Sequence, residues 1–220
     1  MEHRVFDPTD DVGKTRRRLP HWEQAGTYAF ITFRTADSLP RAARDAWADE
    51  RARWLWCHGI DAGAGDRAAI VAALSAADRR ELTRDCSEFW QRLLDAGHGP
   101  CLLRRPHLRS VVASVIQRLD GIRYDVEAFV VMPNHVHVLI GLGKTGAVRR
   151  ECRAWKHLSA KGINALLGRR GTFWQPESWD HLVRTPESFA RIRRYISENP
   201  ARAGLKADDF TLYVRAGGTG

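Results

Sequence analysis

The sequence predicts an α+β protein in which helices lie on the faces of an antiparallel β-sheet. Two observations support this class. Predicted elements follow in the order strand, helices, helix, strand, strand, helix and helix, which segregates helices from strands. In addition, only Pro133-Asn134 separates two apolar strands. This connection is too short for a parallel crossover, so the two strands should pair as an antiparallel hairpin.

The first strand is expected over residues 28–35, which are rich in aromatic and β-branched side chains. Apolar residues occur on both faces of this strand, so both faces can be covered by other parts of the protein. Helices follow over 41–57 and from Ser75 to about residue 97, and Ser75 with Asp78 three residues later resembles a capping box. Residues 41–98 therefore read as an inserted helical pair.

The later elements close the predicted fold. They are a helix opened by Pro106, strands over 123–132 and 134–142, a long helix over 147–167, and short strands or an ordered loop over 172–184. Thr185 and Pro186 then suit the cap and first position of a last helix, expected to run to about Glu198. Because Pro200 follows Asn199, Asn199 is expected to leave the helical conformation.

The 220 residues are enough for one large domain. We expect a basic N-terminal arm over 1–25, a single domain over 26–205 that carries the helical insertion, and a tail over 206–220. No internal repeat or low-complexity segment interrupts this plan.

The chain is strongly basic. Lys and Arg number 35 against 26 acidic residues, which gives a net charge of +9. Such a balance is typical of proteins that bind a polyanion, most often nucleic acid, although a basic protein without that role has the same composition.

Four cysteines stand far apart without a CxxC pair, which argues against a cysteine-based zinc site and fits a reducing compartment. The first residues lack the apolar core of a signal peptide, and no apolar run reaches the ~18 residues of a membrane span. A cytoplasmic, nucleoid-associated protein with no membrane partner is expected.

His135 and His137 are the first candidate site. Side chains alternate along a strand, so these two imidazoles share one face while Val136 and Val138 share the other. Neutral imidazole is the commonest protein ligand for a divalent metal. Two histidines alone do not make a metal site, and a half-buried or surface pair is the alternative.

Tyr195 and Asn199 are the second candidate site. They are four residues apart in the last predicted helix and therefore share a face. A phenolic oxygen can act as a nucleophile, and an amide oxygen can ligate a hard cation. By residue type alone, however, a tyrosine at the core boundary and an asparagine at a helix end are the ordinary interpretations.

Taken together, these segments resemble a known family. Met132-Pro133-Asn134-His135-Val136-His137 resembles the His-hydrophobic-His motif of the HUH single-tyrosine transposases, an IS200-like family. The segment from Tyr195 to Leu205 resembles their tyrosine helix. Segments 30–40, 171–175 and 179–184 are similar to the branch called REP-associated tyrosine transposases. The resemblance covers roughly residues 26–205 in the expected order, and the combination of motifs is highly specific.

The resemblance implies a ferredoxin-like sheet and a specific chemistry. His135, His137 and Asn199 would hold Mg²⁺ or Mn²⁺, and Tyr195 would be the nucleophile. The family cuts single-stranded DNA at palindromic hairpins, leaving a 5′-phosphotyrosine and a free 3′-OH. The metal would neutralise charge on the phosphodiester. A phenol has a reference pKa near 10, so a nearby cation should favour its ionised form. The implied partner is single-stranded or hairpin DNA, bound by a monomer or a homodimer.

Arg149, Arg153 and Lys156 lie on the long basic helix and are candidates for phosphate contact, with a solvated surface as the alternative. Two other functions compete with the nickase. One is a catalytically silent, domesticated DNA-binding protein that recognises structured repeats. The other is a zinc hydrolase, which would need an acidic general base that the motif lacks.

Overall fold

The structure is a computed structural model that describes residues 3, 5, 13–16, 20–39, 41–58, 60, 74–143 and 147–216. Two compact units make up the chain. One comprises residues 1–36 together with 100–220, and the other comprises residues 37–99. The expected insertion over about 41–98 falls within residues 37–99.

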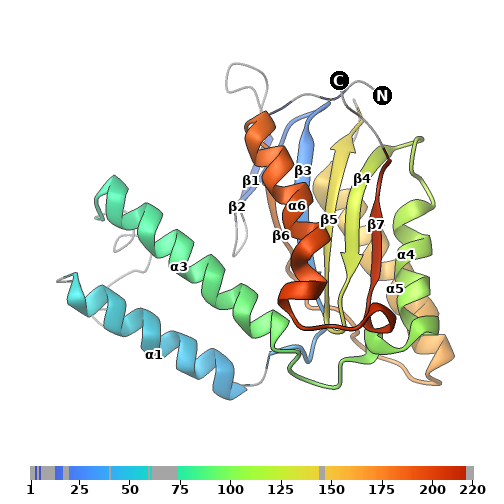
Figure 1. Cartoon of the computed structure of the whole chain (residues 1–220), viewed down its shortest axis with the longest axis horizontal. Helices are drawn as coiled ribbons and strands as arrows, with labels where there is room; N and C mark the ends of the chain where they lie inside the picture. The colour runs from blue at the N-terminus through green and yellow to red at the C-terminus, as the bar shows by residue number, and fades with distance from the viewer. Residues whose placement is uncertain are drawn as a thin grey trace. The chain divides into compact units, whose positions relative to one another are not determined.

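A five-stranded antiparallel sheet forms the centre of the first unit, in the order β6-β3-β5-β4-β7 (Figure 1). Its strands are β3 (Tyr28–Arg34), β4 (Tyr124–Val131), β5 (His135–Leu142), β6 (Trp179–Leu182) and β7 (Thr211–Val214). The predicted β4–β5 hairpin is confirmed, with Val131 opposite Val136. Strands β1 (Gly13–Arg16) and β2 (Pro20–Glu23) form a separate two-stranded sheet.

Two helices cover one face of the sheet and one covers the other (Figure 1). Helices α4 (Pro106–Gln117) and α5 (Val148–Leu166) enclose the larger core, while α6 (Pro186–Arg202) packs on the opposite face. The chain order β3, α4, β4, β5, α5, β6 with both connecting helices on one side is the ferredoxin-like arrangement, so the predicted fold class is confirmed. Single-turn 3₁₀ helices η1 (Leu102–Arg104) and η2 (Ala207–Asp209) lie at its margins.

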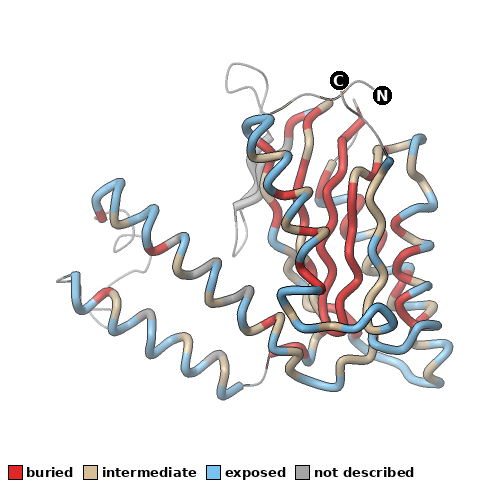
Figure 2. The backbone as a smooth tube through the Cα atoms, in the orientation of Figure 1, coloured by how far each residue is buried: buried red, intermediate tan, exposed pale blue. Residues whose placement is uncertain are grey.

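Strand β5 is buried along its whole length because helices cover both of its faces (Figure 2). Val136, Val138 and Ile140 face the α4–α5 core, and Leu139 faces α6. Both faces of β3 are covered too, as predicted, with Ile31 on the α4–α5 side and Phe30 on the α6 side. The sheet is therefore a rigid, dry platform for any polar side chain on its central strands.

The described part of the second unit contains α1 (Arg41–Cys57) and α3 (Ala76–Asp95). The predicted cap of α3 is present, since the backbone N–H of Asp78 donates to the Ser75 hydroxyl at 3.1 Å. Leu55, Leu74 and Leu82 form a small buried cluster of their own.

Two terminal expectations differ from the structure. The segment 206–220, expected as a tail, supplies β7, which pairs with β4 and completes the sheet. Within residues 1–25, expected as an arm, β1 and β2 form a hairpin; residues 1–2, 4, 6–12 and 17–19 lie outside the described residues. Within the described ranges, no helix combines the length and apolar character needed to span a membrane.

The last helix also differs from its prediction. It continues past Pro200 to Arg202, so Asn199 stays helical. Pro200 is tolerated because a proline near a helix end costs few hydrogen bonds. The final carbonyls are still used, with the N–H of Ala203 donating to Asn199 O at 3.0 Å.

Candidate active site

The histidine pair lies at the centre of the sheet, on the face covered by α6. His135 and His137 are 0% and 2% exposed, and their ring centroids are 4.7 Å apart. The period-2 geometry of β5 places them beside Leu139, away from Val136 and Val138. Two imidazoles are thus held together on a strand with little freedom to move.

A neighbouring polar group fixes each imidazole. The Asn134 Oδ1 lies 2.8 Å from His135 Nδ1, and the Thr32 Oγ1 lies 2.7 Å from His137 Nδ1. Because an amide oxygen only accepts, His135 Nδ1 carries the proton, and its Nε2 keeps a lone pair. This is the partnership that orients metal-binding histidines in proteins.

Both histidines are neutral at physiological pH. Burial, with a smaller contribution from Arg34, lowers the pKa of His135 to about 3. Burial, with a smaller contribution from His135, holds the pKa of His137 well below its usual 6.5. Neutral imidazole is the form that can ligate a metal, because protonation would occupy the lone pair.

Tyr195 meets this pair from α6. Its hydroxyl lies 3.1 Å from His137 Nε2, and its ring is 5.2 Å from the His137 ring. The Arg202 guanidinium lies over the Tyr195 ring at 5.9 Å from its centroid. Tyr195 and His137, which are 58 residues apart in sequence, therefore meet within one chain.

Asn199 follows one helical turn after Tyr195 and is 0% exposed. Neither its Oδ1 nor its Nδ2 has a hydrogen-bond partner among the described residues, and the same holds for His135 Nε2. Buried polar atoms without partners are rare and costly, so their presence here needs an explanation. A divalent cation held by the two imidazoles and the Asn199 amide oxygen would provide one.

A second group of possible ligands stands apart from this site. His58, Asp78 and Glu81 bring their ligand atoms within 4.8 Å of one another in the second unit. The His58 Nδ1 already bonds Trp54 O, and Asp78 bonds the Ser75 hydroxyl. These contacts give the group an ordinary role at the helix ends.

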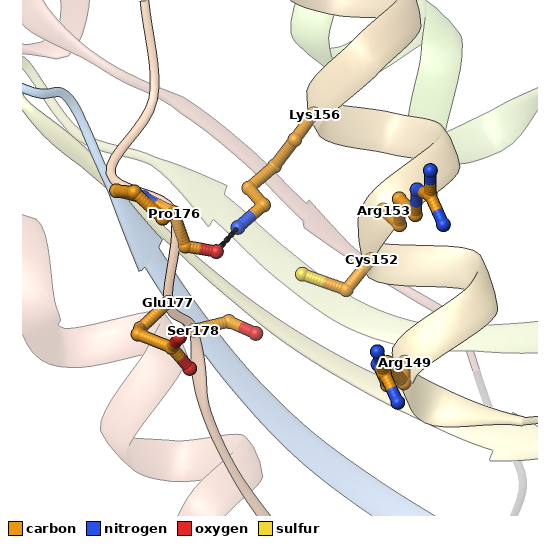
Figure 3. A pocket seen from close by; sticks show the side chains of 7 residues that line it. All are labelled: Arg149, Cys152, Arg153, Lys156, Pro176, Glu177 and Ser178. Carbon is orange, nitrogen blue, oxygen red and sulfur yellow. Dashed lines mark hydrogen bonds between the residues drawn. The ribbon is translucent and has the colours of Figure 1, made fainter. Parts of the chain in front are cut away.

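The three candidate DNA-binding residues lie elsewhere in the first unit. Arg149, Arg153 and Lys156 line a polar cavity of about 350 Å³ between α5 and the segment 176–178 (Figure 3). Lys156 Nζ donates to the carbonyls of Gln175 and Pro176, at 3.0 and 2.8 Å. Since α5 and α6 cover opposite faces of the sheet, this cavity is on the other side from Tyr195.

Sequence reasoning missed two neighbours of the site. Thr32 contacts His137 but looks like an ordinary β-branched residue of strand β3, and only the register that places it opposite His137 identifies it. Phe30 stacks on His137 with ring centroids 5.5 Å apart. Trp174 is buried in the α4–α5 core and donates its indole N–H to the Ser159 hydroxyl at 2.9 Å.

Comparison with known proteins gives the following matches. Residues 103–199 match the family model described as "Transposase IS200 like". Among solved structures, the chain is similar to a REP-associated tyrosine transposase bound to a REP hairpin, at 16% identity over 87% of this chain and 75% of the other, with a TM-score of 0.43. It is also similar to a protein of Deinococcus radiodurans R1 described as a candidate transposase, at 16% identity over 78% and 89% of the two chains, with a TM-score of 0.34.

None of the curated proteins compared matches the chain. The matched segment includes both histidines and extends through Tyr195 to Asn199. The similarity to the IS200-like transposase family therefore extends over residues 103–199 of this chain.

Proposed function

We propose that the protein is a metal-dependent single-stranded DNA endonuclease and strand transferase that acts at palindromic hairpins through a 5′-phosphotyrosine intermediate. The observation that carries this proposal is the meeting of Tyr195 with a buried, neutral histidine pair. One helical turn further on, the Asn199 side chain has no hydrogen-bond partner in the part of the chain that the structure describes. We assign the protein to the REP-associated branch within this proposal, because the segments 30–40 and 171–184 resemble the motifs of that branch.

Tyr195 would attack phosphorus through its hydroxyl oxygen. The new O–P bond forms as the bond from phosphorus to the 3′-oxygen breaks. The phenolic proton is lost, and the leaving oxygen gains a proton to become a 3′-OH. Energy of the phosphodiester is conserved in the phosphotyrosine, so a later 3′-OH can reverse the step and join strands.

His135, His137 and Asn199 would hold Mg²⁺ or Mn²⁺ through two Nε2 atoms and an amide oxygen. When bound, such a cation polarises a phosphoryl oxygen and neutralises charge. Asn134 and Thr32 would keep both imidazoles in the ligating orientation through their Nδ1 contacts. The burial of all three ligands excludes competing water from the protein side of the site.

DNA binding would rest on the basic surface of the first unit. Arg149 and Arg153 are exposed on α5 and suited to phosphate contact, whereas Lys156 is held by two backbone carbonyls and would mainly position the 176–178 segment. One chain supplies both the histidines and the tyrosine, so a monomer could carry a complete site.

A nicking assay tests the proposal. A labelled DNA hairpin built from inverted repeats beside the coding region is incubated with protein and Mg²⁺ or Mn²⁺. We expect a covalent protein–DNA adduct in the wild type and none in Tyr195→Phe, which should still bind the hairpin. Binding without cleavage in the wild type would favour the catalytically silent DNA-binding protein instead. Cleavage that releases DNA free of protein would favour a hydrolase.

A further inference from the structure

An exposed aromatic side chain stands on the same face of the sheet as Tyr195. Trp179 on edge strand β6 is 42% exposed, although tryptophan side chains are largely buried on average. Alternation along β6 places Trp179 and His181 on the α6 face, because Leu182 packs into the α4–α5 core on the other. His181 is half-buried beside it.

The Trp179 and His181 rings are connected to His137 and Tyr195 through Phe30. The Trp179 and His181 centroids are 4.7 Å apart, and both contact Phe30, at 5.8 and 5.5 Å. Phe30 in turn contacts His137 at 5.5 Å and Tyr195 at 6.0 Å. An unbroken row of rings therefore leads from the exposed indole to the phenol.

The strand register gives the separation. Thr32 of β3 lies opposite Trp179 on one side and opposite His137 on the other. Trp179 and His137 are thus two strand spacings apart, which is about 10 Å at ~4.8 Å per spacing. A nucleotide that neighbours a phosphate at Tyr195 can reach this distance.

Positive charge flanks the rings. Burial, with smaller contributions from the guanidinium groups of Arg184 and Arg191, lowers the pKa of His181 to about 4. His181 is therefore neutral, and two cations stand close enough to act on it. A ligand that complements this surface needs a flat π-face and a nearby negative charge, and a nucleotide has both. Stacked aromatics within a basic groove are the usual device for holding single-stranded nucleic acid.

We propose that Trp179 and His181 form a stacking subsite for one nucleobase of the single-stranded DNA next to the phosphate that Tyr195 attacks. This inference rests on the proposed function and adds a contact that positions the strand. A base stacked on Trp179 would fix the register of the strand, so that a single phosphate comes to the phenol. Stacking requires no particular base, so the subsite would set position more than sequence.

The test measures binding of a fluorescein-labelled hairpin with a short single-stranded thymidylate extension, next to the same DNA carrying one abasic site in the extension. Trp179→Leu keeps an apolar side chain on the strand but removes the π-face, and Trp179→Phe restores a ring. We expect Trp179→Leu to weaken binding of the extended hairpin about tenfold, the loss typical of one base–aromatic stack, and Trp179→Phe to recover most of it. Trp56→Leu is the matched control, since Trp56 is 72% exposed in the second unit, and should change nothing.

The abasic scan decides the outcome. At one position, the abasic site should weaken wild-type binding by a similar factor, and it should cost Trp179→Leu nothing further. The subsite would be overturned if Trp179→Leu weakened binding of a hairpin without the extension as much as that of the extended hairpin. It would also be overturned if the losses caused by Trp179→Leu and by the abasic site simply added. A protein partner as the true occupant would leave all DNA affinities unchanged, which also overturns it. The nucleophile is tested separately. If the abasic site and Trp179→Leu have non-additive effects on binding but no covalent adduct forms, the proposed function alone is refuted. If an adduct forms but the two effects are additive, the subsite alone is refuted.

Discussion

Replacing Asn199 by leucine should stabilise the metal-free protein. The Asn199 side chain is completely buried, and neither of its polar atoms has a partner among the described residues. A buried donor or acceptor without a partner costs about 1–3 kcal/mol, and replacement by an apolar group of similar shape removes this cost. Leucine would also join Ile192 and Ile196, which already form an apolar cluster on α6.

We therefore expect Asn199→Leu to raise the free energy of unfolding by about 1–3 kcal/mol in chelator-treated protein. For a chain of this size, each kcal/mol moves the melting temperature by about 2–4 °C. The same variant should lose the stabilisation that Mg²⁺ or Mn²⁺ gives the wild type, because it has no amide oxygen to offer. In the proposed site, Asn199 would therefore lower the stability of the metal-free fold in exchange for binding the cation.

Asn164→Leu is the matched control. Asn164 Nδ2 donates to Gly171 O at 2.8 Å, and its Oδ1 accepts from Arg169 Nε at 3.0 Å. Losing these hydrogen bonds should destabilise the protein by about 0.5–1.5 kcal/mol each. Thermal and urea unfolding with and without metal give both results. An Asn199→Leu protein that is less stable than the wild type in chelator, yet still stabilised by metal, would refute the assignment of Asn199 as a ligand.

Three further predictions concern metal, pH and DNA. Mn²⁺ at 100 times its dissociation constant should stabilise the wild type by about 2.7 kcal/mol and so raise its melting temperature in differential scanning fluorimetry. The melting temperature of His137→Ala should not change. The metal-free protein should lose stability as the pH falls from 6.5 towards 4, because burial holds the pKa of His135 near 3 and that of His181 near 4 while the unfolded chain takes up those protons at about 6.5. The slope should reach up to about 1.4 kcal/mol per pH unit for each histidine that is neutral when folded and protonated when unfolded. Urea unfolding of His181→Asn should therefore show a shallower slope than the wild type. Finally, Arg149→Gln/Arg153→Gln should weaken hairpin binding uniformly across sequences and lower the salt slope by about 0.9 per phosphate contact, and an unchanged slope in anisotropy titrations would exclude these arginines from the interface.

Much of the fold follows from local patterns. The strands around Pro133-Asn134, the cap at Ser75 and the helix start at Thr185 were predictable because each depends on side chains within a few residues. The missed strand β7 forms only because β4 offers an unpaired edge, which is a tertiary property. The helix end at Arg202 differed for a similar reason, since packing of Ile196 and Asn199 against the sheet outweighs the local effect of Pro200.

Local patterns predicted which candidate residues share a face, but not which of them meet across elements. Alternation along β5 correctly predicts one shared face for His135 and His137, and helical spacing gives the same for Tyr195 and Asn199. The meeting of Tyr195 with His137 depends on α6 crossing the sheet opposite α4 and α5, which no local pattern specifies. Thr32, Phe30 and Trp179 join the site only through strand register, so residue type alone could not identify them.

The central claim is that Tyr195 becomes covalently joined to DNA. Wild-type protein incubated with the hairpin and Mn²⁺, digested with protease and nuclease, and analysed by tandem mass spectrometry tests this directly. A 5′-phosphonucleotide attached to the peptide that contains Tyr195, absent from Tyr195→Phe, is the predicted result. Cleaved DNA with no peptide attached, or an adduct on another residue that persists in Tyr195→Phe, would contradict it.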